Sequence, residues 1–87
     1  MFCLDEAIIF DNDISNGEPY LVNLLDGRLY HLNKTAEIII TAIVEKLEID
    51  EIQDLVYRTT LGEKEIINND VTNFINTLLE KNIIIEQ

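Results

Sequence analysis

Short apolar runs alternate with clusters of turn-forming residues over the first third of the chain. Residues 7–11, 20–25 and 28–32 form strand-length runs that are rich in Ile, Leu and Tyr. The Asp-Gly pair at 26–27 separates the last two runs. This pair is a strong hairpin signal, and it predicts a positive φ at both of its residues. The Asn-Gly pair at 16–17 predicts a turn between the first two runs, within a longer loop. The pattern therefore predicts a three-stranded antiparallel meander.

Apolar residues recur at helical spacing after residue 32. Asn33 is a suitable N-cap, because its side-chain oxygen can accept a backbone N–H of the first turn, and it predicts a first helix over 34–47. Apolar side chains cover more than half of the circumference of this helix, so we expect it to form the buried centre of the fold. These side chains are Ile38, Ile39, Ile40, Ala42, Ile43, Val44 and Leu47.

A second helix is expected to begin at Asp50. Gln53 follows three residues later, which predicts a capping box at the start of this helix. Gly62 is a natural residue for its C-terminal end, because glycine readily takes the left-handed conformation that ends many helices. The sequence thus predicts a second helix of about three turns.

A third helix is expected to begin from a cap at Asn68 or Asn69 and to end at residues 81–82. Residues 83–85 are then a short terminal strand or an extended tail. Three strands followed by three helices, without a linker or a repeat, predict a single α+β domain over residues 1–87 with a winged-helix-like arrangement. On the third helix we expect Val71, Phe74 and Leu78 to form a stripe that packs in the core. Ile75 and Leu79 lie beside this stripe and are expected to line a groove.

The charge balance narrows the possible partners. Seventeen acids against six bases give a formal net charge of −11. Nucleic acid and anionic membranes are therefore poor partners, because both are bound through Lys and Arg. No apolar run approaches the roughly 18 to 20 residues that span a bilayer, and the N-terminus has no basic region of a secretory signal. The single cysteine, Cys3, cannot form an internal disulfide and is expected to be a small apolar residue. These features predict a cytoplasmic protein.

The sequence offers few residues for chemistry. One His and one Cys do not make a metal site, and Asp11-Asn12-Asp13 lacks the glycine and glutamate of a calcium loop. A catalytic triad would need Ser15 and His31, and nothing supports that pairing. We therefore expect a protein that is not an enzyme and that binds no metal or cofactor.

Three segments together resemble the PqqD family. They are LNKTAEII at 32–39, DEIQDLV at 50–56 and DVTNFINTLLEKNII at 70–84. Members of this family are leader-peptide recognition domains of ribosomally made, modified peptides, also called RiPP recognition elements. The resemblance extends over roughly residues 18–86. The glycine often found between the first two helices is replaced by Glu48-Ile49, and the generic first strand leaves the subfamily open.

The resemblance implies a non-enzymatic adaptor. A precursor leader peptide would add as a strand beside the third strand, with its apolar side chains in a groove against the third helix. The adaptor would then present the peptide to a modifying enzyme, such as a radical or protease-type maturase, in natural-product or cofactor biosynthesis. The expected peptide-binding residues are Arg28, Leu29, Tyr30, His31, Leu32, Val71, Ile75, Leu78 and Leu79.

Two other functions remain open. A winged-helix-like transcription regulator would use the third helix to contact DNA, but Asp70 and Glu80 there outweigh Lys81, and a recognition helix needs donors for phosphates and bases. A self-associating interaction module would pair an open strand edge with another copy of the chain as a homodimer.

Overall fold

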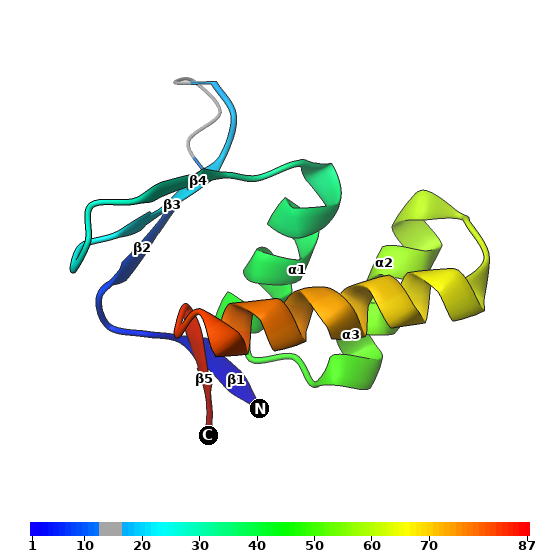
Figure 1. Ribbon diagram of the computed structural model, residues 1–87. Coiled ribbons are helices and arrows are strands. Elements are labelled where there is room, and N and C mark those ends of the chain that lie inside the picture. The colour runs from blue at the N-terminus through cyan, green and yellow to red at the C-terminus, as the bar shows by residue number, and fades with distance from the viewer. Residues whose placement is uncertain (13–16) are drawn as a thin grey trace.

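A computed structural model describes residues 1–12 and 17–87 of the chain. Asp13, Ser15 and Asn16 therefore lie outside the described residues. Of the turn predicted at 16–17, only Gly17 is described. Within the described part, the expected α+β fold is confirmed: a three-stranded sheet lies at one end and three helices pack beside it (Figure 1). In chain order the elements are β1 (Phe2–Leu4), β2 (Ile8–Asp11), β3 (Tyr20–Asn23), β4 (Leu29–His31), α1 (Lys34–Val44), α2 (Ile49–Thr60), α3 (Lys64–Glu80) and β5 (Ile84–Glu86).

The sheet β2-β3-β4 is the predicted antiparallel meander, with β3 in the middle. Its register sets Phe10, Leu21 and Tyr30 in one cross-strand row. Leu21 is only 1% exposed and belongs to the core, so this row marks the inner face of the sheet. Because side chains alternate along a strand, Ile9 and Leu29 lie on the outer face, and both are about half exposed at 49%.

The hairpin between β3 and β4 is wider than predicted. Asn23 and Arg28 form its last paired position, where the Asn23 N–H donates to the Arg28 carbonyl at 2.9 Å, so the loop comprises residues 24–27. Gly27 has a φ of 73° and donates its N–H to the Asn23 carbonyl at 2.8 Å, whereas Asp26 does not take a positive φ. The expected two-residue turn is therefore wrong. Side-chain bonds within the loop favour the longer form, because the Asn23 and Asp26 carboxamide and carboxylate oxygens each accept a backbone N–H two residues on, at 2.9 Å.

Helix α1 is the buried centre of the fold, as its sequence predicts. The Asn33 side chain accepts the Ala36 N–H at 2.8 Å, which confirms the predicted N-cap. Ile40, Ala42 and Ile43 are fully buried against the other layers. The helix ends three residues earlier than expected, at Val44, because Lys46 takes a φ of 67° and turns the chain toward α2.

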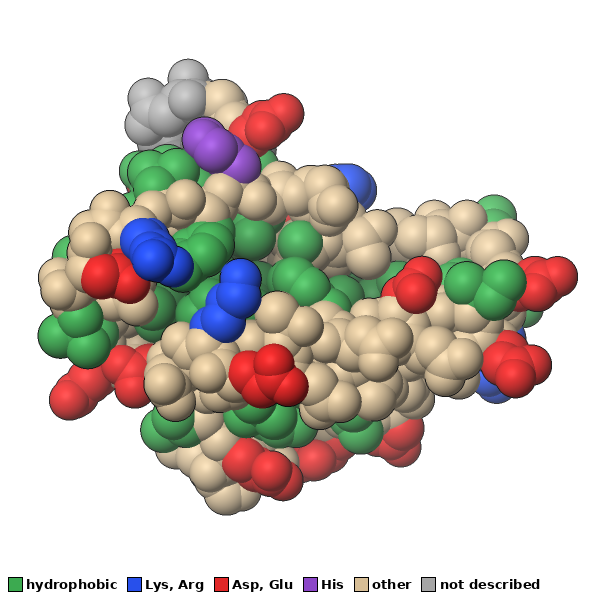
Figure 2. Space-filling model, viewed as in Figure 1, with side chains coloured by type: hydrophobic (Ala, Val, Ile, Leu, Met, Phe, Trp, Pro, Cys, Tyr) green, Lys and Arg blue, Asp and Glu red, His purple; other side chains and the backbone are tan. Residues whose placement is uncertain are grey.

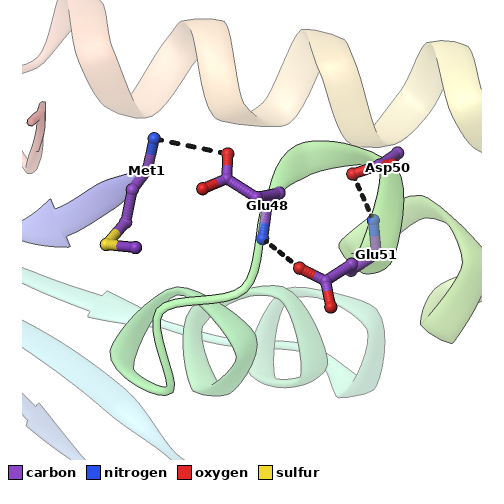
Figure 3. Close-up of polar contacts among 4 residues, drawn as sticks. All are labelled: Met1, Glu48, Asp50 and Glu51. Atoms are coloured by element: carbon purple, nitrogen blue, oxygen red, sulfur yellow. Dashed lines mark hydrogen bonds and ion pairs between the residues drawn. The ribbon is translucent and has the colours of Figure 1, made fainter.

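The N-terminus of α2 uses different capping residues from those predicted. Glu48 is the N-cap, and its backbone N–H donates to Glu51 Oε1 at 2.9 Å in a capping box (Figure 3). The expected box between Asp50 and Gln53 is therefore wrong by two residues. The α-amino group of Met1 also lies 3.4 Å from Glu48 Oε2, which connects the beginning of β1 to this cap.

Helix α3 begins four residues or more before the predicted caps at Asn68 and Asn69. It starts at Lys64, and both asparagines lie inside it. Ile67 and Val71 lie one turn apart on its buried face, at 8% and 0% exposure. Burial of this pair outweighs the preference of asparagine for helix ends, since helix stability in proteins comes mainly from packing of the apolar face.

A separate two-stranded sheet joins the ends of the chain. β1 pairs antiparallel with β5, with Phe2 opposite Glu86 and Leu4 opposite Ile84 (Figure 1). The sequence pattern does not predict β1, whereas the terminal strand expected near 83–85 is present as β5. Cys3 lies half-buried in β1 with no disulfide. Among the described residues, no helix has the length and apolar character needed to cross a bilayer.

Candidate binding groove

Strand β4 offers an open edge of the sheet. The backbone bonds at Arg28 and Leu32 point toward β3, where Leu32 donates its N–H to the Pro19 carbonyl at 3.0 Å. Tyr30, two residues from each, lies opposite Leu21 and faces β3 as well. The N–H and C=O groups of Leu29 and His31 therefore point away from the sheet, because backbone groups alternate in direction along a strand. Among the described residues, no other strand pairs with this side of β4.

A groove runs between the open edge of β4 and helix α3. It encloses a cavity of about 210 Å³, and an apolar hollow is visible there in the space-filling view (Figure 2). Its lining comes from four parts of the chain: the sheet, the start of α1, the last half of α3 and the segment before β5. The lining residues are Leu21, Tyr30, His31, Leu32, Asn33, Ala36, Phe74, Thr77, Leu78, Lys81 and Ile83.

One face of α3 supplies the helical wall of the groove. Phe74, Thr77, Leu78 and Lys81 stand at spacings of three, four and seven residues, which places them on the same side of an α-helix. Leu78 is buried at 4% exposure and forms part of the core beneath the groove. Phe74 is half-buried, so its ring is partly available to a ligand.

The groove continues beyond β4 toward α1. A second hollow of about 180 Å³ lies between the start of α1 and the middle of α3, and Asn33, Ala36 and Phe74 line both hollows. These shared residues mark the end of the groove away from Lys81. The small side chain of Ala36 leaves the space open at this point, because a larger residue on α1 would project into it.

The groove is cationic at one end although the chain is strongly acidic. Lys81 Nζ lies 5.6 Å from the centroid of the Tyr30 ring, within the range of a cation–π contact. No Asp or Glu lines the cavity beside β4. In the space-filling view, Lys and Arg side chains border the apolar hollow (Figure 2). The cavity lining thus carries one lysine and no acid, although the chain as a whole is acidic.

The structure places the five predicted residues of the third strand in different positions. Tyr30, His31 and Leu32 line the cavity. Leu29 does not line it, since its side chain points to the outer face, although its backbone belongs to the open edge. Arg28 is exposed beside the hairpin loop, with its Nε 3.7 Å from Asp26 Oδ2.

The structure places the predicted residues of α3 in different environments. Leu78 lines the groove, but Val71 and Ile75 are core residues with 0% and 1% exposure. The expectation that Ile75 lines the groove is therefore not supported by its position, and the half-buried Leu79 does not line the cavity either. Phe74, assigned to the core from the sequence, takes the groove position instead. The helical spacing of Phe74, Leu78 and Lys81 was the available signal, but it needed the position of β4 to be interpreted.

No metal-binding cluster accompanies the groove in the described part of the chain. No group of three or more His, Cys, Asp or Glu side chains gathers there in a way that could hold a metal ion. What the groove offers is an unpaired strand edge, an apolar cavity and one adjacent cation. These features suit the binding of an extended chain.

Comparison with protein families identifies a matching family model. The model described as Coenzyme PQQ synthesis protein D (PqqD) matches residues 18–84. This range includes strands β3 and β4, the three helices and the residues that line the groove. No curated protein matches the sequence.

Two solved structures share this fold over nearly their entire lengths. One is described as TbiB1 in complex with the TbiA(beta) leader peptide, with a TM-score of 0.85 and 18% sequence identity, covering 98% of this chain and 96% of that one. The other is a lasso peptide synthetase B1 complexed with the leader peptide, with a TM-score of 0.84, 16% identity and 98% of each chain covered. At these identities, the similarity establishes the fold.

Proposed function

This chain belongs to the PqqD family, and we propose from this membership and its groove that it is an adaptor for a precursor peptide. The leader segment of the peptide adds as a strand along β4 and places apolar side chains in the groove against α3. Both structures that share the fold are described as complexes with leader peptides, which supports this choice of ligand. The observation that carries the proposal is the position of the open β4 edge directly beside an apolar cavity.

The available contacts are sufficient for useful affinity. The outward N–H and C=O groups of Leu29 and His31 offer four backbone hydrogen bonds, each contributing about 1 kcal/mol. Two or three buried aliphatic side chains of the peptide contribute about 1.5–3 kcal/mol each. A micromolar complex requires about −8 kcal/mol, which the upper end of these contributions reaches after about 4 kcal/mol is subtracted for the lost freedom of the peptide. The groove needs no charged hot spot to bind at this level.

The adaptor acts without chemistry of its own. It holds the leader so that the following part of the precursor reaches a separate modifying enzyme, such as a radical or protease-type maturase. The edge of the bound leader that faces away from β4 and the chain beyond the groove remain accessible for that enzyme. The adaptor raises the effective concentration of the precursor at the modifying enzyme, because an enzyme and a peptide held on one adaptor meet more often than free ones.

A titration tests the proposal directly. Short peptides encoded near the gene for this protein are synthesised with a fluorescent label, and their anisotropy is measured as the protein is added. We expect one of them to bind through its N-terminal segment with a micromolar or lower Kd. Scrambled versions of the same composition serve as controls and should not bind. Absence of binding by every neighbouring precursor contradicts the proposal.

The same edge has a competing occupant, a second copy of the chain. Light scattering across protein concentrations distinguishes the two, because self-pairing through β4 gives a dimer that the peptide dissociates. The charges of α3 disfavour a DNA-binding function. The helix contains three acids, Glu65, Asp70 and Glu80, and its only bases are Lys64 and the C-cap residue Lys81. Retention of labelled duplex DNA at physiological salt, with no peptide binding, would favour that function instead.

A further inference from the structure

The cation at one end of the groove indicates a specific feature of the peptide. Lys81 is exposed, and within residues 1–12 and 17–87 no carboxylate forms an ion pair with it, although the chain has seventeen acids. It is held over the face of Tyr30, whose backbone belongs to the strand that a peptide would join. A Lys held against the binding strand, with its charge unmatched, provides a site for a carboxylate from the ligand.

The geometry of a strand fixes where that carboxylate would come from. Residues of an added strand that lie opposite Tyr30 and Leu32 point to the same face as these side chains, toward α3, and they are two residues apart in the peptide. On the helix, Lys81 and Phe74 are seven residues apart, which separates them by about 10 Å along the axis. The peptide residue opposite Tyr30 therefore lies at the Lys81 end, and the residue opposite Leu32 lies at the Phe74 end.

The two ends differ in the chemistry they accept. At the Phe74 end, the side chains of Leu32, Ala36 and Phe74 fit an aliphatic or aromatic side chain. The second hollow beyond this end is lined by Asp70, which disfavours an acid there. The Lys81 end carries an amine and no acid. We propose that Lys81 is a specificity-determining residue, and that the recognised peptide carries an Asp or Glu two residues from the apolar residue that fills the groove. This inference rests on the proposed function and names the ligand class more narrowly.

The net charge of −11 does not prevent this contact. At physiological salt the Debye length is about 8 Å, so most surface acids are screened from a carboxylate in the groove. A direct ion pair beside the partly buried Tyr30 ring is screened less. The long-range field disfavours a peptide of high net negative charge, whereas the contact position selects a single acid.

A selection experiment with a charge swap tests the inference. Random twelve-residue peptides displayed on phage are selected against the protein, and selected peptides are resynthesised for affinity measurements. We expect enrichment of an apolar residue with Asp or Glu two positions away. Changing that acid to Asn or Gln should weaken binding by about tenfold, which corresponds to about 1.4 kcal/mol.

Variants of two lysines provide the matched comparison. Lys81→Glu should reverse the preference, so that peptides with Lys or Arg at the acid position are selected and bind better than the original. Lys64→Glu is the control, because Lys64 Nζ lies over Tyr57 at 5.9 Å in a similar arrangement but does not line the groove. It should leave the acidic preference unchanged. Raising the ionic strength from about 0.1 M to about 1 M, which shortens the Debye length from about 10 Å to about 3 Å, should reduce the preference.

The outcomes separate this inference from the proposed function. One outcome overturns the inference and leaves the adaptor function in place. In it, Ala36→Leu fills the groove and abolishes peptide binding, but the peptides show no preference for an acid and no response to Lys81→Glu. Selected peptides that bind equally well to Ala36→Leu, or no selected peptides at all, contradict both.

Discussion

The two edges of the three-stranded sheet, β2 and β4, have open backbones but different surroundings. On β2 the Ala7 carbonyl accepts the Leu24 N–H at 2.9 Å, and Ile9 lies opposite Val22, so the groups of Ile8 and Phe10 point away from β3. The Ile8 N–H donates to the Asp5 carbonyl at 2.9 Å, which leaves Phe10 as the residue whose outward N–H compares with those of β4. On β4 the outward groups are those of Leu29 and His31. Only β4 lines one of the described hollows, the one shared with α3.

This difference shows what makes a strand edge a binding site. An edge alone supplies backbone hydrogen bonds, which are the same for any sequence and give no selectivity. A cavity beside the edge adds pockets for alternate side chains of the added strand. β4 has both, which is the basis of the proposed function. The following variants test whether the two edges differ in this way, in order of the expected effect.

A proline on the β4 edge should have the largest effect on peptide binding. His31→Pro removes an outward N–H and places a ring where the added strand would lie, while the bonds of Tyr30 and Leu32 to β3 remain. We expect binding to weaken by at least about thirtyfold, more than the roughly 1 kcal/mol of one hydrogen bond, because the ring also obstructs the strand. Fluorescence anisotropy with a bound peptide measures the change.

The control for this variant is His31→Ala, which keeps the N–H and removes only the side chain. It should bind within about threefold of the unmodified protein, and circular dichroism should show both variants folded. Equal losses in the two variants would show that the side chain, and not the strand edge, carries the interaction.

Filling the groove should have the next largest effect. Ala36→Leu places added volume in the hollows lined by Leu32 and Phe74, and we expect a loss of affinity of about tenfold with little change in thermal stability. Ala42 lies on the same helix but is fully buried, so Ala42→Leu overpacks the core and should cost about 1–3 kcal/mol. The two variants thus separate groove from core by comparing peptide titration with chemical denaturation. Ala36 is itself 9% exposed, so a similar stability loss in both variants would show that the hollow beside it does not accept a larger side chain.

Neighbouring residues of α3 should respond in opposite ways. Ile75→Ala removes a side chain that is 1% exposed and should lower the free energy of unfolding by about 2–5 kcal/mol. Phe74→Ala should cost less stability, because Phe74 is half-buried, but should weaken peptide binding by about fivefold. Urea denaturation and anisotropy measure the two quantities. A reversed order would restore Ile75 as the groove residue expected from the sequence.

The β2 side should give the smallest effect on binding. The Tyr20 hydroxyl donates to Asp11 Oδ2 at 2.9 Å, across the pair β2 and β3. Tyr20→Phe removes this bond and should lower the free energy of unfolding by about 0.5–1.5 kcal/mol. Peptide affinity should stay within about twofold. A larger loss of affinity would indicate that the β2 side takes part in binding.

The sequence predicted the elements better than their boundaries. The meander, the Asn33 cap and the buried α1 follow from local patterns, and they are present. Helix α3 was predicted to start too late, because the asparagines at 68–69 favour a cap and only the packing of Ile67 and Val71 overrides that preference. β1 could not be predicted, since its partner β5 is separated from it by almost the whole chain.

The groove was predictable in location but not in its residues. The hairpin and the family resemblance indicated the strand at 28–32 and the third helix. The side of the helix that faces this strand depends on the angle at which α3 crosses the sheet. A small rotation of the helix would place Ile75 in the groove in place of Phe74. The sequence assigns Lys81 to the end of the third helix and to the charge balance of that helix. Its contact with Tyr30 could not be predicted, because it joins residues far apart in the sequence.

Amide hydrogen exchange, resolved by residue with NMR, tests the central claim most directly. The protein is compared alone and saturated with a bound precursor peptide. The account predicts slower exchange at the Leu29 and His31 amides, which point outward from β4. It predicts little change at Tyr30, which already bonds to β3, or at Phe10 on the other edge. New protection at Phe10, with none at Leu29 and His31, would contradict it.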